Sequence, residues 1–415
     1  MDVPTLLKKR TEKRYWNGTH RAIAPAETVA HLTPHLKRFG ITRVANVTGL
    51  DWLGIPVVMV CRPNAKSLSV SQGKGLTLDA ARASGIMESL ELHHAERIDN
   101  PVKLGSHEEF SNSHSVVDTA QFPFLMTNGY HPQKELLWIE GYDVIQEKTT
   151  WVPYEYVSAN ASNHRCQGDG SFILGSNGLA SGNNLLEAIT HGACEIVERD
   201  AMTLWRYSNS EMRDSRALDL RSCDDSTCKG LLERCHEAGI HVYAWELTSD
   251  IGIPCFLCLL CEDSRSSNRG RYSSAGMGCH TSKSIALMRA IVEAAQTRLT
   301  MISGSRDDIF RDEYNQSRAE PDDLSRFRAL LRSKSKLRSF SDIPSSERET
   351  FNDDLDLLMQ RLRFIGIQNF IVVRLMEPNS SFQIVKVIIP GLEGSSHLPG
   401  YCPGQRVQVQ QGNFL

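Results

Sequence analysis

One pattern occurs three times along the chain and limits what it can fold into. Segments that begin at Gly40, Gly239 and Gly366 each start with Gly-Ile, pass through β-branched and apolar residues, break at a turn, and resume as a second apolar run. This pattern predicts two strands joined by a tight connection. A helical pattern precedes each segment, over residues 26–39, 228–238 and 353–364. Because the spacing is too wide for a solenoid, we expect three related β-rich units within one large fold.

A second repeat joins a glycine-rich segment to a long helix. SQGKG at 71–75 precedes a helical pattern over 77–96, and SSAGMGCH at 273–280 precedes one over 284–302. GSNGLASGNN at 175–184 precedes a helix over 185–207 but has no hairpin repeat beside it. The glycines predict a turn before each helix. Such turns at helix N-termini expose backbone N–H groups that suit phosphates. The sequence therefore predicts an α/β (mixed α+β) fold with three long helices.

Each long helix carries a polar stripe at helical spacing. The stripes consist of Ser84, Glu88 and Glu91 in the first helix; Asn183, Glu187, His191, Glu195 and Glu198 in the second, with Arg199 beside them; and Arg289, Glu293 and Gln296 in the third, with Arg298 close by. The neighbouring residues are small or apolar, so these carboxylates are expected to be half-buried. Buried like charges are costly unless a cation compensates them.

The stripes predict a metal site, and oxygen ligands of this kind suit Mg²⁺ bound to phosphates. The alternative is that each stripe is an ordinary solvent-exposed face with charge pairs four residues apart. The combination of three glycine-rich segments with three acidic helices favours the metal site.

Composition excludes several other classes of protein. With 46 Lys and Arg against 49 Asp and Glu the net charge is -3, which argues against a nucleic-acid partner. No apolar run approaches the roughly 20 residues that span a bilayer, and the first residues lack the apolar core of a signal peptide. Eleven cysteines, an odd number and few for this length, argue against a disulfide framework. A cytoplasmic protein without membrane contacts is expected.

The ordered series SQGKG, ASGIMESLE, SNGLASGNNLLEAITHGACEIVERDA and GMGCHTSKSIALMRAIVEAAQTRL resembles the YcaO family of ATP-dependent enzymes. The resemblance runs from about residue 15 to 393 and implies a single catalytic domain over 1–415, with a core over 15–393 and a Gly/Pro-rich tail over 394–415. Family members phosphorylate a peptide-backbone amide oxygen with ATP, after which a nucleophile adds to the amide carbon. Attack by a Cys, Ser or Thr of the peptide gives an azoline, whereas external sulfide gives a thioamide.

The resemblance also implies roles for individual residues. Its ATP-binding positions match Arg21, Ser84, Glu88, Glu91, Asn183, Glu187, Glu195, Glu198, Arg199, Glu293 and Gln296, and its metal ligands match Glu88, Glu91, Glu187, Glu195 and Glu198. Arg199 and Lys74 are the expected catalytic residues, since cationic side chains neutralise charge that develops during phosphoryl transfer. Leu92 stands where the family often has Arg.

The end of the chain and two further motifs favour one branch of the family. The chain ends VQVQQGNFL without the PxPxP tail of many azoline-forming members, and GITRVANVTGLDWLGIPV and LWIEGYD look most like members that act with a TfuA-type partner. Thioamide formation in a peptide, with a TfuA-like partner and a sulfide donor, is therefore the leading hypothesis. Azoline formation, a non-catalytic ATP-binding scaffold, and a ligase or kinase acting on a free carboxylate are the alternatives. A homodimer is the default expectation for the assembly.

Other polar residues have simpler interpretations. Cys255, Cys258 and Cys261 fall in a predicted strand, where a spacing of three places successive sulfurs on alternate faces, so we expect buried structural cysteines. His280, at a helix start, is a further candidate for phosphate contact. We expect the peptide to dock as an extended segment near the tail after Gly391.

Overall fold

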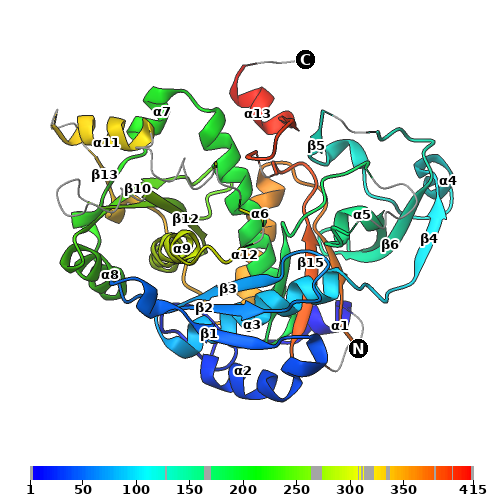
Figure 1. Cartoon of the computed structure of the whole chain (residues 1–415). Helices are drawn as coiled ribbons and strands as arrows, with labels where there is room; N and C mark the ends of the chain where they lie inside the picture. The colour runs from blue at the N-terminus through cyan, green and yellow to red at the C-terminus, as the bar shows by residue number, and fades with distance from the viewer. Residues whose placement is uncertain are drawn as a thin grey trace.

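The structure is a computed structural model. It describes residues 3–126, 129–162, 170–262, 273–306, 308–309, 312, 322–332, 337–377, 380–394 and 396–412. Helices and sheets are mixed, as predicted. Figure 1 shows helix α6 (Leu185–Tyr207) running through the centre of the molecule, with α3 (Leu78–Ala95) and α9 (Lys283–Ser303) nearby. These three helices correspond closely to the long helices that the sequence predicts.

All three predicted hairpins are present. They are β1 (Arg43–Asn46) with β2 (Val57–Cys61), β10 (Ile240–Glu246) with β11 (Cys255–Glu262), and β14 (Ile371–Arg374) with β15 (Gln383–Ile388), each pair antiparallel. A third strand extends each hairpin: β3 (Val70–Lys74), β12 (Ser273–Cys279) and β8 (Leu179–Gly182), respectively. Strand β3 leads into α3, β12 into α9 and β8 into α6. The third unit is therefore discontinuous in sequence, since its hairpin follows its helix.

The prediction of glycine-rich turns is wrong, because most residues of these segments form strands. Ser71–Lys74 lies within β3, and SSAGMGC forms β12. Their glycines allow close packing on the helix that follows. A Cβ atom on Gly73 would lie 2.0 Å from the carbonyl oxygen of Ala81, and one on Gly276 would lie 2.1 Å from the backbone nitrogen of Ala294. Each glycine thus brings its strand against its helix.

Most remaining elements surround these units. The sheet of the third unit continues through β6 (Leu136–Asp143) to β4 (Val102–Gly105) and β7 (Lys148–Pro153). The first predicted helix is shorter than expected: α2 (Pro25–Leu32) gives way to a 3₁₀ helix over Thr33–Phe39 that ends at Gly40, where φ is +74°. The helices α8 (Ser226–Glu237) and α12 (Phe351–Phe364) match the prediction. The charged stretch 303–350 lies partly outside the described residues and includes α11 (Asp322–Arg332).

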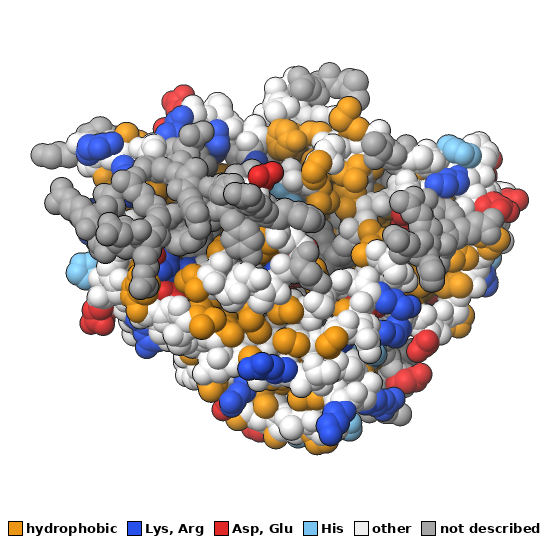
Figure 2. Space-filling model, in the orientation of Figure 1, with side chains coloured by type: hydrophobic (Ala, Val, Ile, Leu, Met, Phe, Trp, Pro, Cys, Tyr) orange, Lys and Arg blue, Asp and Glu red, His pale blue; other side chains and the backbone are white. Residues whose placement is uncertain are grey.

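The Gly/Pro-rich C-terminal segment contains regular secondary structure. It contains β16 (Tyr401–Cys402), which pairs with β5 (Phe124–Leu125), and a short helix α13 (Gln405–Gln410). Figure 1 shows α13 beside one end of α6, and Figure 2 shows hydrophobic side chains gathered on the surface near it. Glu393 fixes this segment, since its carboxylate accepts hydrogen bonds from the Tyr401 hydroxyl and from the Gly404 and Val407 backbone N–H groups.

The cysteines of β11 alternate between two hydrophobic cores, as expected. Cys255 and Cys261 belong to the core around α6 and α12, whereas Cys258 belongs to the core around α8 and α9. All three are buried. They therefore do not converge as ligands of one ion.

Candidate nucleotide and metal site

Helix α6 presents its predicted stripe into the interior of the protein. The side chain of Asn184 caps the helix by accepting a hydrogen bond from the backbone N–H of Glu187 at 2.9 Å. From there Glu187, His191, Glu195 and Glu198 follow at intervals of three or four residues, so they share one face. Glu187 is 8% exposed and Glu198 5%, which shows that the stripe is not a solvent face.

Carboxylates from three helices meet at this face. Glu88 comes from α3, Glu195 and Glu198 from α6, and Glu293 from α9, and the charges of these residues affect one another's pKa values. Two cations lie among them. The Lys74 Nζ is 2.7 Å from a carboxylate oxygen of Glu293, and the Arg199 Nη1 is 3.7 Å from one of Glu198. We call this group the carboxylate cluster.

The carboxylate cluster contains more negative charge than its cations balance. Burial raises the pKa of Glu88 to about 7, even though Lys74 opposes the shift. Burial and the neighbouring Glu293 raise the pKa of Glu198. Burial also raises the pKa of Glu91, although Ser181 donates a hydrogen bond to it. Protons and a divalent cation are therefore alternative ways to compensate these carboxylates.

The donor set fits a magnesium ion that also binds phosphate. Among the described residues no three His, Cys, Asp or Glu side chains are already grouped as a metal cage. Mg²⁺ does not require one, because it usually binds one or two carboxylates together with waters and phosphate oxygens. The buried Glu187 and Glu198 and the half-buried Glu88, Glu91 and Glu195 are the carboxylates that would hold it here. When bound, it would neutralise phosphate charge.

A small polar cavity of about 110 Å³ lies between α3, α6 and α9. Arg21, Ser84, Glu91, Glu187, His191 and Arg289 are among the residues that line it. Glu187 accepts hydrogen bonds from the Ala22 backbone N–H at 3.0 Å and from the Asn183 side chain at 2.9 Å. The Nε of Arg21 and the Oγ1 of Thr190 are buried without a hydrogen-bond partner. Such groups fit a polar ligand that would complete their hydrogen bonds.

Two histidines beside this cavity are neutral. Burial lowers the pKa of His191 well below its usual value, and the nearby Arg289 adds to the shift. Both Arg289 Nη atoms lie 3.2 Å from the His191 Nδ1, which therefore accepts. Burial likewise lowers the pKa of His280. His280 thus lines the cavity as a neutral group, whereas Arg289, which was not among the predicted ATP contacts, supplies a cation.

One predicted neighbour of the site lies elsewhere. Arg298 is buried in an ion-pair network with Asp51 and Glu262, since it lies five residues beyond Glu293 on another side of α9. Gln296 is half-buried on α9, three residues after Glu293, and its backbone carbonyl accepts a hydrogen bond from the Thr300 hydroxyl.

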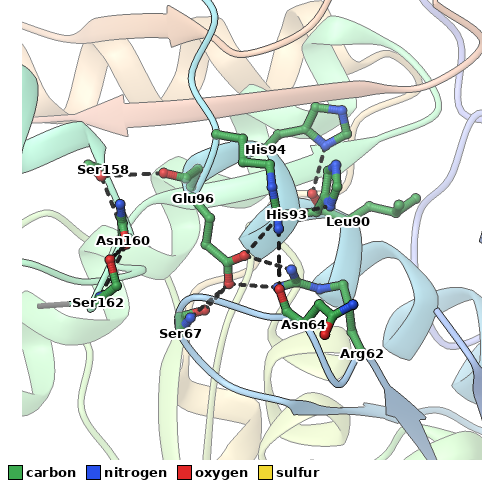
Figure 3. Close-up of polar contacts among 12 residues, drawn as sticks. Arg62, Asn64, Ser67, Leu90, His93, His94, Glu96, Ser158, Asn160 and Ser162 are labelled. Carbon is green, nitrogen blue, oxygen red and sulfur yellow. Dashed lines mark hydrogen bonds and ion pairs between the residues drawn. The ribbon is translucent and has the colours of Figure 1, made fainter. Parts of the chain in front are cut away.

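The far end of α3 has a structural role. Figure 3 shows His93 and His94 beside a buried ion pair in which Arg62 donates to both carboxylate oxygens of Glu96, at 2.6 and 2.7 Å. Burial opposes ionisation of Glu96, but hydrogen bonds from Arg62 and Ser67 hold its pKa below the usual value. Glu96, which directly follows α3, is therefore a satisfied buried carboxylate, unlike the acids of the carboxylate cluster.

Buried and half-buried carboxylates that alternate with Lys74, Arg199 and Arg289 define a protein that binds a nucleotide together with a divalent cation. The chain belongs to the YcaO family: the family model described as "YcaO cyclodehydratase, ATP- and Mg²⁺-binding" matches residues 72–393. This confirms the resemblance and the expectation of ATP and Mg²⁺. No described helix is both long enough and apolar enough to cross a membrane.

Several relatives and solved structures are similar to the chain. An uncharacterised protein encoded in the tfuA 3' region of Rhizobium leguminosarum bv. trifolii is 34% identical over 94% of this chain and 93% of its own length. A YcaO protein from Methanopyrus kandleri, solved with AMPPCP and Mg²⁺, has a TM-score of 0.69 and 21% identity over 92% of this chain and 95% of its own. A heterocyclase solved with substrate and cofactor has a TM-score of 0.78 and 22% identity; the match covers 98% of this chain but 56% of the heterocyclase.

Proposed function

We propose that this protein uses Mg-ATP to phosphorylate a backbone amide oxygen of a peptide, after which sulfur replaces that oxygen to give a thioamide. The observation that carries the proposal is the carboxylate cluster, in which buried and half-buried acids from three helices lie around Lys74 and Arg199. Such a site is suited to phosphoryl transfer, where catalysis consists mainly of positioning and charge compensation.

Each part of the site has a role in this proposal. Arg21, Ser84, Asn183, Glu187 and Gln296 bind the nucleotide, with Glu293 orienting Lys74. The metal ligands are Glu88, Glu91, Glu187, Glu195 and Glu198. Arg199 and Lys74 are the catalytic cations that stabilise charge on the transferred phosphoryl group.

The thioamide product is favoured by the relative in the tfuA 3' region, which is similar to this chain along nearly its whole length. A TfuA-like protein that supplies sulfide is the proposed partner, and a ribosomally made peptide or protein is the proposed substrate. We further propose that the chain works as one catalytic domain, with a homodimer as its assembly.

Azoline formation is the second candidate, because the chain also shares its fold with a heterocyclase solved with substrate. In that case a Cys, Ser or Thr of the peptide would attack the activated amide. A non-catalytic scaffold is disfavoured because the acids and cations that phosphoryl transfer requires are all present. A ligase or kinase would act on a free carboxylate instead of a peptide amide.

The mass of the peptide product separates these candidates. Candidate peptides encoded near the gene would be incubated with the protein, Mg-ATP, sulfide and a TfuA-like partner, then analysed by intact mass spectrometry. We expect a gain equal to the difference between sulfur and oxygen. A loss of mass equal to one water would show azoline formation. ATP turnover that requires a substrate with a free carboxylate, and does not occur with the peptide, would show the ligase or kinase. ATP binding with no phosphate release under any of these conditions would support the scaffold.

A further inference from the structure

A second cavity, of about 340 Å³, borders the carboxylate cluster. Glu195 and Arg199 of α6 line it, together with Tyr156, Arg306, Lys386 and His397. We call it the cationic cavity. Because Glu195 and Arg199 also belong to the stripe of the proposed ATP site, a molecule in the cationic cavity would lie next to the reacting phosphoryl group.

Lys386 is the most unusual residue of the cationic cavity. It lies on strand β15 opposite Leu179 of β8, among apolar neighbours, and it is 2% exposed. Its ammonium donates a hydrogen bond to the Gly175 carbonyl at 2.6 Å and lies 5.6 Å from the centre of the Tyr156 ring. Among the residues that the structure describes, no carboxylate lies within ion-pair distance of this ammonium. A buried lysine without a carboxylate partner is uncommon in proteins and points to a ligand.

The charges around Lys386 favour an anion. Arg199 and Arg306 add two guanidinium groups, and Arg306 is partly balanced by Asp308, whose Oδ1 is 2.8 Å from the Arg306 Nε. Burial lowers the pKa of His397, and Arg206 and Arg199 lower it further, so this residue is neutral near pH 7. Burial lowers the pKa of Lys386 to about 8, which leaves it mostly protonated at pH 7. Glu195 is the carboxylate that lines the cationic cavity.

We propose that the cationic cavity binds hydrosulfide, the anionic sulfur nucleophile, and that Lys386 holds it beside the amide that is being activated. This inference rests on the proposed thioamide-forming function and names the site of its second substrate. A small anion needs only part of the volume, so the cavity can also admit the reacting peptide segment. Its walls include residues 173–177 together with Gly394, His397 and Leu398, and these last three lie in the tail where the sequence predicts peptide docking.

The chemical step is balanced without any oxidant or reductant. Transfer of the γ-phosphoryl group to the amide oxygen forms an O–P bond and releases ADP, and the amide nitrogen loses its proton. The sulfur of hydrosulfide then forms a bond to the amide carbon while the bond between that carbon and the phosphorylated oxygen breaks. Phosphate leaves with the former amide oxygen. The hydrosulfide proton moves to the nitrogen, which restores the N–H of the thioamide, and the proton first lost leaves on the phosphate.

Direct binding tests the cavity without any product being formed. Sodium sulfide would be titrated anaerobically into the full-length protein with Mg²⁺ and a non-hydrolysable ATP analogue, and the heat of binding recorded. We expect saturable binding by the wild-type protein and by Lys386→Arg, and its loss in Lys386→Met. Absence of saturable binding to the wild-type protein would overturn the inference, whatever product the enzyme makes.

Kinetics then connect the cavity to the reaction. At saturating Mg-ATP and peptide, Lys386→Met is expected to raise the KM for sulfide by about 10- to 100-fold, the value of one charge-assisted hydrogen bond. The KM for ATP should stay close to the wild-type value. Lys134→Met is the matched control, because Lys134 bonds to Ser171 outside the cationic cavity, and it should leave both constants unchanged.

Arg306→Met provides a second test if Lys386→Met fails to fold, because the Arg306 side chain is 29% exposed and its replacement disturbs less packing. A severalfold rise in the KM for sulfide is expected for this variant. A wild-type KM for sulfide in the folded Lys386→Met protein, or in Arg306→Met where Lys386→Met does not fold, would overturn the assignment. If the wild-type protein binds sulfide but makes no thioamide, the proposed function fails while the anion site stands.

Discussion

Glu187→Gln and Glu198→Gln are each expected to lower ATP turnover by about 100-fold or more while the fold is kept. Glutamine has nearly the shape of glutamate but cannot supply the negative charge that a magnesium–phosphate complex requires. The fold should tolerate both changes, because burial raises the pKa of Glu187 and of Glu198 and so disfavours their charged forms in the free protein. In Glu187→Gln, the side-chain amide oxygen can still accept a hydrogen bond from the Ala22 backbone N–H.

Phosphate release, melting temperature and nucleotide binding would be measured for both variants. Glu233→Gln is the matched control, since Glu233 is exposed on α8, far from the stripe in sequence, and its replacement should leave turnover unchanged. Wild-type turnover in both Glu187→Gln and Glu198→Gln would remove the carboxylate cluster from the account.

Arg406→Met is expected to destabilise the protein by about 3–5 kcal/mol, because it leaves a buried carboxylate without its partner. Arg406 on α13 donates from its Nε and Nη2 to both oxygens of Asp200, at 2.8 and 3.0 Å, and Asp200 is fully buried on α6. Asp200 follows Arg199 directly, so this pair connects the C-terminal segment to the helix α6 that carries Arg199. Burial already raises the pKa of Asp200 to about 6 although Arg406 opposes the shift.

Thermal unfolding of three further variants would isolate the charge effect. Asp250→Asn removes the exposed partner of Arg406 and should cost no more than about 1 kcal/mol. The stability of Arg406→Lys should lie between those of Asp250→Asn and Arg406→Met, since lysine keeps the charge but not the paired hydrogen bonds. The double variant Asp200→Asn with Arg406→Met should recover part of the loss because no buried charge remains unpaired. Equal stability of Arg406→Met and Asp250→Asn would contradict this description of the tail.

Local patterns in the sequence were sufficient for much of the fold. The hairpins follow from apolar runs on either side of turns, and the bounds of α6 follow from its helical period and the glycine-rich segment before it. Pairing between distant segments was not predictable, because nothing near β8 indicates that a hairpin from the end of the chain adds to it. The glycine-rich segments were misread as turns because glycine also serves where a strand and a helix approach closely.

The acidic residues of the candidate site could be predicted from the sequence more fully than its cationic residues. Regular spacing on one helix face identified Glu187, Glu195 and Glu198, whereas Arg289 depends on how α9 packs against α6. Lys386 could have been noticed in the sequence, because it is a single lysine with two apolar residues on either side of it in strand β15. The tail helix α13 is too short for its sequence period to indicate it, and its position depends on long-range contacts with Glu393 and Asp200.

The central claim, that ATP activates a peptide amide at its oxygen, is tested most directly by the fate of that oxygen. A substrate peptide carrying oxygen-18 at the modified amide would be converted by the protein with Mg-ATP, and the released phosphate analysed by mass spectrometry. We predict one heavy oxygen in the phosphate for each peptide modified, whether the product is a thioamide or an azoline. Modified peptide accompanied by unlabelled phosphate would contradict the account.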